Sequence, residues 1–205
     1  MSYEILTSFL FASFALAFSP GPDNIFVLTQ SIVNGKKYGL ATVFGLITGC
    51  LVHTTLVAFG VSALIKANEN LFFTIKLLGA IYLLYLAYNV FVTDVAISLS
   101  VEKVAKKTTG QLFRQGFVMN VLNPKVSIFF LAFFPGFLFS DALGTVAQFY
   151  ILGFLFMFVS LLVFSAIAIL AGTISETIKK SSKVGVYLKW MQIIVFVAIA
   201  IFILV

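Results

Sequence analysis

Long apolar runs alternate with short polar connections along the whole chain. About 20 helical residues cross a bilayer core of about 30 Å. Six runs reach that length, at residues 5–33, 40–64, 71–92, 117–138, 146–171 and 184–204. The pattern predicts an all-α membrane protein of six transmembrane helices, forming a single membrane domain over residues 1–205. Apolar sequence resumes directly after the first interruption, so we expect the first run to be a retained span.

Two of the six runs are interrupted by proline. The first contains Ser19-Pro20-Gly21-Pro22-Asp23-Asn24, and the fourth contains Asn123-Pro124-Lys125. Proline removes a backbone donor, and an ionisable side chain is costly in hydrocarbon. Such segments are tolerated at membrane depth only where they line a cavity or are buried against protein. We therefore expect transmembrane helices 1 and 4 to be interrupted at a polar site.

The longest connection, residues 93–115, is polar and basic and divides the chain into two halves. Residues 1–92 and residues 116–205 each contain three predicted spans. Because three is odd, the second half enters the membrane from the opposite face. This arithmetic predicts two inverted 3+3 repeats, in which the interrupted helices occupy corresponding places and meet near the midplane of the bilayer.

Positive charge is distributed unequally between alternate connections. The loops at residues 34–39, 93–115 and 173–183 hold nine basic residues, whereas the loops on the other side hold only Lys66. Since positive residues stay in the cytoplasm, these three loops are predicted to be cytoplasmic and both termini outside. The nine residues are Lys36, Lys37, Lys103, Lys106, Lys107, Arg114, Lys179, Lys180 and Lys183.

Composition excludes a soluble protein. The 205 residues are 61% hydrophobic and only 10% charged, and the mean hydropathy is +1.14. The net charge of +6 could indicate a nucleic-acid partner, but the basic residues lie in short loops between apolar runs. We expect the lipid bilayer, and no nucleic acid, to be the partner of this surface. Cys50 is the single cysteine, which excludes an intramolecular disulfide.

A small zwitterion suits the chemistry of the two breaks. Free N–H groups at the start of a half-helix attract a carboxylate, and free carbonyls at the end of the preceding half attract an ammonium group. Lys125 and Asp23 add full charges of both signs, and amide and hydroxyl side chains add hydrogen bonds. The residues predicted to bind substrate are Ser19, Pro20, Gly21, Pro22, Asp23, Asn24, Gln30, Asn123, Pro124 and Lys125.

Asp23 is also a candidate for proton coupling. A carboxylate in a poorly solvated site can take up and release a proton near neutral pH. Two other interpretations stay open: Asp23 caps the second half-helix, or it pairs permanently with Lys125.

Several other residues have structural interpretations. Gly45 and Gly49 form a Gly-x-x-x-Gly pattern that favours a close helix contact over a ligand site. Tyr82, Tyr85 and Tyr88 recur at helical spacing, which favours packing or an interfacial belt, with a substrate-lining role as the alternative.

Other classes of membrane protein fit less well. Cys50 and His53 lie one turn apart and make half a metal site, but the chain has no other cysteine or histidine, so no metal site and no cofactor are expected. A thiol-redox carrier needs two cysteines. An intramembrane hydrolase needs a nucleophile with a base or paired carboxylates, and Asp23 is the one acid deep in a span, so we do not expect an enzyme.

At these motifs the chain resembles the LysE/RhtB family of bacterial amino-acid exporters. The length of the chain and the number of predicted spans match this family. The matching motifs are Ser19-Pro20-Gly21-Pro22 with Asp23 or Asn24 following, Asn34-Gly35 leading to Gly39, Gly45 and Gly49, Lys76-Leu77-Leu78-Gly79-Ala80-Ile81-Tyr82-Leu83, and Asn123-Pro124-Lys125.

The resemblance implies efflux of amino acids or similar small zwitterions across the bacterial inner (cytoplasmic) membrane, coupled to proton antiport. It also implies that the two proline motifs form the translocation site. Export as the direction of transport rests on the resemblance alone. The alternatives are export of another small solute or of a metal cation within the wider group of six-helix transporters. Homo-oligomer formation stays open.

Overall fold

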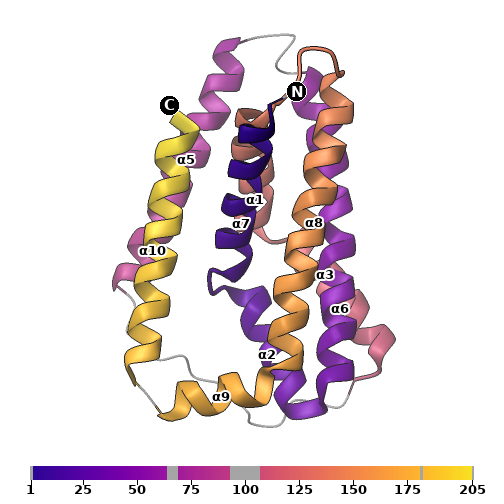
Figure 1. Cartoon of the computed structure of the whole chain (residues 1–205), viewed down its shortest axis with the longest axis vertical. Helices are drawn as coiled ribbons and strands as arrows, with labels where there is room; N and C mark the ends of the chain where they lie inside the picture. Colours follow the sequence, from indigo (N-terminus) through magenta and orange to yellow (C-terminus); the bar gives the residue numbers. More distant parts are fainter. Residues whose placement is uncertain (1, 64–68, 93–106, 181, 205) are drawn as a thin grey trace.

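The computed structural model describes residues 2–63, 69–92, 107–180 and 182–204, and every regular element in these ranges is helical (Figure 1). Lys66, Lys103 and Lys106 lie outside the described residues. The α-helices are α1 (Tyr3–Phe18), α2 (Pro22–Asn34), α3 (Lys36–Leu56), α5 (Glu69–Val92), α6 (Thr109–Val121), α7 (Pro124–Ile128), α8 (Thr145–Ile169), α9 (Ala171–Lys180) and α10 (Ser182–Leu204). Three short turns complete them: the π-helical η1 (Val57–Val61) and η2 (Phe129–Phe133), and the 3-10 helix η3 (Phe134–Phe137).

The helices can provide six membrane crossings. Four continuous segments are long and apolar enough to span a bilayer, namely Lys36–Val61, Phe73–Val92, Thr145–Ile169 and Gly185–Leu204. Two further helix pairs qualify as single spans bent at a break: α1 with α2, bent by 57°, and α6 with Pro124–Phe137, bent by 49°. The prediction of an all-helical membrane fold is confirmed at this level.

Proline explains the first break. A residue before proline avoids helical backbone angles, and Ser19 accordingly ends α1 in an extended conformation, at φ −63° and ψ 120°. Pro22 begins α2, where a missing N–H costs nothing. The side-chain amide of Asn24 donates to the carbonyl of Ala17 at 2.8 Å, so one carbonyl left free at the end of α1 finds a partner.

The second break has the same origin. Asn123 is extended, and its side chain caps α7, in which Pro124 is the first residue. The helix before the break, α6, begins earlier than the sequence pattern predicted. Residues 109–115, expected in the basic loop, are helical because Thr108 and Gln111 form a reciprocal capping box at the start of α6.

The two other predicted basic loops are also shorter than expected. Residues 34–39 reduce to a one-residue turn at Gly35, whose φ of +96° suits glycine. Most of residues 173–183 form α9, which runs across the lower end of the molecule (Figure 1). The search for apolar runs did not predict α9, because its sequence, AGTISETIKK, is too polar to span a membrane.

The helices α3, α6 and α8 pack side by side, and glycines let α3 and α6 approach closely (Figure 1). A Cβ on Gly45 would overlap the carbonyl oxygen of Phe113, and one on Gly49 would lie 2.7 Å from Asn120 Oδ1. The predicted close helix contact at Gly45 and Gly49 is therefore confirmed. On the other side of the molecule, α5 packs along α10, and α1 and α7 lie between the two groups.

Phenylalanines fill the half of the molecule that holds the N-terminus of α1 and the C-terminus of α10. The rings of Phe130 and Phe134 stack at 4.2 Å, and Phe9 contacts Phe134 edge-on at 5.1 Å. We call this set the aromatic cluster; all its members are buried, and they are Phe9, Phe129, Phe130, Phe133, Phe134, Phe137 and Phe156. No run or spacing in the sequence distinguished these rings from lipid-facing ones.

Candidate substrate site

The two breaks meet, and one amide joins them. The side-chain Oδ1 of Asn123 accepts the backbone N–H of Lys125 at 3.0 Å, which fixes the orientation of the amide because a backbone N–H can only donate. The Nδ2 of Asn123 then donates to Oδ2 of Asp23 at 3.2 Å. Asp23 and Asn123 are 100 residues apart in the chain. The prediction that residues of both motifs lie together is realised by this contact.

Lys125 lies against the backbone of the first break. Its Nζ is 3.5 Å from the carbonyl oxygen of Ser19 and 5.0 Å from the ring centroid of Phe196. A Cβ on Gly21 would lie 3.4 Å from the same Nζ, so the glycine leaves room for the ammonium group. Among the described residues, Lys125 forms no ion pair with Asp23 at 4.0 Å or less. The permanent pair considered from the sequence is absent here.

Asp23 does not cap α2 either. Gly21 is the N-cap residue of that helix, and no side-chain hydrogen bond caps it. Asp23 is buried, and within the described part of the chain its Oδ1 has no hydrogen-bond partner. Both structural interpretations of Asp23 are therefore wrong, and its carboxylate keeps one oxygen available.

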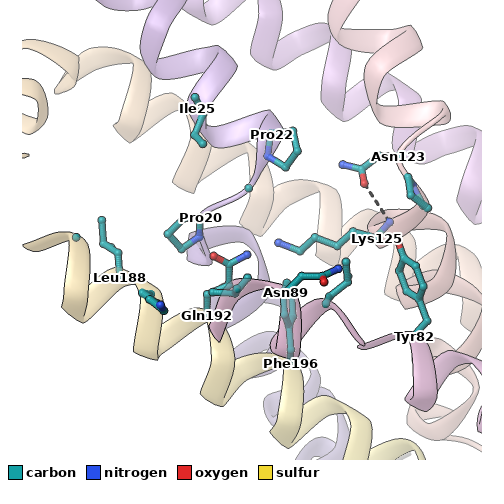
Figure 2. Close-up of a pocket in the computed structure, with 16 residues that line it drawn as sticks. Pro20, Pro22, Ile25, Tyr82, Asn89, Asn123, Lys125, Leu188, Gln192 and Phe196 are labelled. Atoms are coloured by element: carbon teal, nitrogen blue, oxygen red, sulfur yellow. Dashed lines mark hydrogen bonds between the residues drawn. The ribbon is translucent and has the colours of Figure 1, made fainter. Parts of the chain in front are cut away.

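A cavity of about 680 Å³ opens beside the breaks (Figure 2). The side chain of Lys125 extends into it from α7. Opposite the breaks, α5 contributes Tyr82 and Asn89, and α10 contributes Gln192 and Phe196. Six of the predicted site residues line this cavity: Pro20, Gly21, Pro22, Asn123, Pro124 and Lys125.

The other four predicted residues do not line the large cavity. Asp23 and Asn24 line a second cavity of about 30 Å³ on the other side of the break. Ser19 is buried and contributes its carbonyl to Lys125. Gln30 lies further along α2, where its Oε1 accepts a hydrogen bond from Asn34 at 2.9 Å. It lines neither cavity.

Sequence reasoning missed the contribution of α5 and α10. Asn89 and Gln192 are amides inside apolar spans, which is a signal that the sequence did contain. Of the three tyrosines at helical spacing, Tyr82 lines the cavity, whereas Tyr85 and Tyr88 are 56% and 62% exposed on the outside of the helix.

The Cys50 and His53 pair has other partners. Cys50 Sγ lies 3.6 Å from Asn120 Oδ1, and His53 Nε2 donates to the backbone carbonyl of Asn120 at 3.0 Å. Within the described ranges, no group of three or more His, Cys, Asp or Glu side chains could hold a metal ion.

Comparison with known proteins gives the chain a family. Residues 14–205 match the family model described as LysE type translocator. The homoserine/homoserine lactone efflux protein of Salmonella typhimurium is 32% identical over 179 residues, covering 87% of this chain and 86% of that protein. The leucine efflux protein of Salmonella choleraesuis is 30% identical over 184 residues, covering 87% and 85%.

No solved structure matches the chain. The family match covers both breaks and all the cavity-lining residues named above. The chain therefore belongs to the LysE family of membrane translocators, which are transporters and not enzymes.

Proposed function

We propose that this protein exports an amino acid, or a similar small zwitterion, across the bacterial inner membrane in exchange for protons. The observation that carries the proposal is the junction of the two breaks, where Lys125 and Asp23 from opposite halves lie around one amide beside a cavity of about 680 Å³. The names of the two relatives, efflux proteins for homoserine and for leucine, support an amino acid as the substrate.

Lys125 is proposed to bind the substrate carboxylate. It is the charged side chain of the break that reaches the large cavity, and its Nζ has a 3.5 Å contact with the Ser19 carbonyl and lies over the ring of Phe196. A charge-assisted hydrogen bond to a carboxylate would be shorter and stronger than either contact. Lys125 can therefore turn toward a bound substrate at little cost.

Asp23 is proposed to alternate between a proton and the substrate ammonium group. Four residues line both cavities and so lie between Asp23 and the large cavity, namely Gly21, Pro22, Asn123 and Lys125. Movement of Lys125 toward a substrate carboxylate would join the two spaces. Because a proton and an ammonium group favour the same carboxylate, occupation by one excludes the other, which is the requirement for antiport.

The apolar part of the large cavity favours an uncharged substrate side chain. Its walls away from Lys125 include Ile25, Leu86, Val90 and Leu188. Cavities of about 300–1,000 Å³ with few polar groups are typical of small-molecule sites. The remaining polar lining residues are Tyr82, Asn89, Lys189 and Gln192. The amides of Asn89 and Gln192 would contact a hydroxyl or amide on the substrate side chain.

The inverted repeat and the orientation remain proposals that the packing supports. The third span of the first half, α5, packs on the last span of the second half, α10, and α3 packs on α8 in the same way. The large cavity extends from the breaks toward the end of the molecule where α9 lies and where α3 and α6 begin (Figure 1). The described basic residues Lys36, Lys37 and Lys107 flank the starts of these helices, so this end is proposed to be cytoplasmic.

The first experiment is a panel of labelled amino acids, including homoserine and leucine, in proteoliposomes of the purified protein. Transport is measured with and without an imposed pH gradient. We expect at least one amino acid with an uncharged side chain to move, and the gradient to accelerate its movement. Absence of transport for every amino acid would overturn the proposed function.

Asp23→Asn tests the proton step. The variant is expected to transport slowly and without response to the pH gradient, since an amide takes up no proton near neutral pH. The matched control is Asp141→Asn, which removes an exposed carboxylate that lines none of the cavities. An Asp23→Asn variant that still responds to the gradient as the unmodified protein does would contradict the proton role.

A further inference from the structure

The small cavity behind the breaks, which we call the chamber, has mainly apolar walls into which a few polar residues are set. It has a volume of about 30 Å³ and is lined by Asp23 from α2, Asn120 from α6, Lys125 from α7 and Ser160 from α8. A cavity that offers more than about 10–15 Å³ to the centre of a water-sized sphere can hold water. The chamber therefore has room for water.

Two oxygens at this cavity are buried without a partner. Asp23 Oδ1 and Ser160 Oγ make no hydrogen bond in the described part of the chain, although both residues line the chamber. Asp23 is 7% exposed and Ser160 is 1% exposed. Buried polar atoms are nearly always hydrogen-bonded, to protein or to ordered water. Each oxygen therefore requires a partner, and a molecule in the cavity that both residues line could serve both.

The chemistry of Asp23 decides what this partner must do. Its Oδ2 accepts from the Asn123 amide, which can only donate, and a carbonyl oxygen accepts better than a hydroxyl oxygen, so the proton on neutral Asp23 is favoured on Oδ1. The group facing Oδ1 must then donate to the ionised carboxylate and accept from the protonated one. A water molecule does both, and a serine hydroxyl beside it can also donate or accept.

We propose that the small cavity binds a water molecule, which bridges Asp23 Oδ1 to Ser160 Oγ, donates to the ionised carboxylate and accepts from the protonated one. The inference rests on the proposed proton antiport and assigns Ser160 as a positioning residue for it.

A monovalent cation fits the chamber less well than water. Its titratable lining groups are Asp23, Lys125 and the thiol of Cys50 on α3, while the lining residues from α1, α6 and α8 carry none. The ammonium group of Lys125 repels a metal cation, whereas it leaves neutral water unaffected.

Ser160→Ala tests the proposal, with Ser13→Ala as the matched control. Ser13 is also a fully buried serine whose hydroxyl has no partner among the described residues, but it lines neither cavity. Two rates are measured in proteoliposomes: exchange of labelled for unlabelled amino acid at equal pH, and export driven by a pH gradient. We expect Ser160→Ala to lose about tenfold in gradient-driven export, the equivalent of one hydrogen bond to the water molecule, and to keep its exchange rate.

Ser13→Ala is expected to keep both rates, and Ser160→Cys to keep part of the coupling, because a thiol donates and accepts weakly. Three outcomes would overturn the water site: unchanged coupling in Ser160→Ala, an equal loss of exchange and coupling in that variant, or export driven by a sodium gradient that Ser160→Ala abolishes. If the unmodified protein exchanges no amino acid, the proposed function itself fails, and this result is distinct from the other three.

Discussion

At the scale of single residues, Asn123 connects the two halves of the protein. Its amide oxygen caps α7, and its amide nitrogen holds Asp23. The first function concerns the stability of a helix, and the second concerns the position of the carboxylate proposed to carry protons. Substitutions that separate these two functions show which one the transporter depends on.

Asn123→Ala removes both functions, whereas Asn123→Ser restores only the cap, because a serine oxygen accepts the backbone N–H but offers no amide to Asp23. We expect Asn123→Ala to lower the free energy of unfolding by about 1 kcal/mol, the usual cost of losing an N-cap. Asn123→Ser should recover most of this loss in a thermal melt and still transport poorly. Normal transport by Asn123→Ser would show that the contact with Asp23 is dispensable.

The type of a residue and its position within an apolar run were enough to predict part of the substrate site. Asp23, Asn123 and Lys125 are polar residues next to prolines inside apolar runs, and the structure brings all three together. Gln30 shows the limit of this reasoning, since it is equally polar but bonds to Asn34 away from both cavities. Ser160 could not be singled out, because a serine in a span often bonds to its own helix and only packing shows that this one does not.

At the scale of elements, the contact between α3 and α6 depends on the absence of side chains. A Cβ on Gly116 would lie 2.5 Å from the carbonyl oxygen of Thr42, and backbone atoms cannot move aside as the end of a flexible side chain can. The two helices therefore touch backbone to backbone at this point.

Gly116→Ala is expected to reduce stability by about 1–3 kcal/mol through overpacking. The matched control on the same helix is Gly110→Ala, since a Cβ there meets nothing within 4 Å. The control should be neutral or slightly stabilising, because alanine favours helix more than glycine does. Thermal unfolding of both variants in one detergent gives the comparison, and equal midpoints would refute the close contact.

The more apolar a helix is, the better its place could be predicted from the sequence. The apolar runs indicated every span, but the start of α6 at Thr109 required a capping signal that was present at Thr108 and Gln111. The helix α9 could not be identified by apolar length, since it lies across the end of the molecule instead of spanning it.

At the scale of the whole molecule, the large cavity and the aromatic cluster occupy opposite ends. The cavity reaches Gly185 and Leu188 near the start of α10, beside α9. The aromatic cluster fills the space between the breaks and the other end, where α1 begins. The structure thus corresponds to a state open on the proposed cytoplasmic side.

Thiol labelling can check this arrangement without removing a native cysteine, because Cys50 is the single cysteine and is buried. A cysteine at Gln192, in the large cavity, should react with a membrane-impermeant maleimide only from the cytoplasmic side. A cysteine at Phe133, in the aromatic cluster, should be protected from both sides. Labelling at position 192 from the periplasmic side alone would reverse the proposed orientation.

The positions of the rings in the aromatic cluster depend on the number of residues in the turn η2 as well as on which residues these are. The π-helical turn η2 contacts η1, which is also π-helical, and each accommodates a wider turn than a regular α-helix does. Deleting one residue from η2 would rotate everything after it by about 100°. Phe134 and Phe137 would then no longer meet Phe9, so the aromatic packing at this end of the molecule depends on the length of η2 as well as on its side chains.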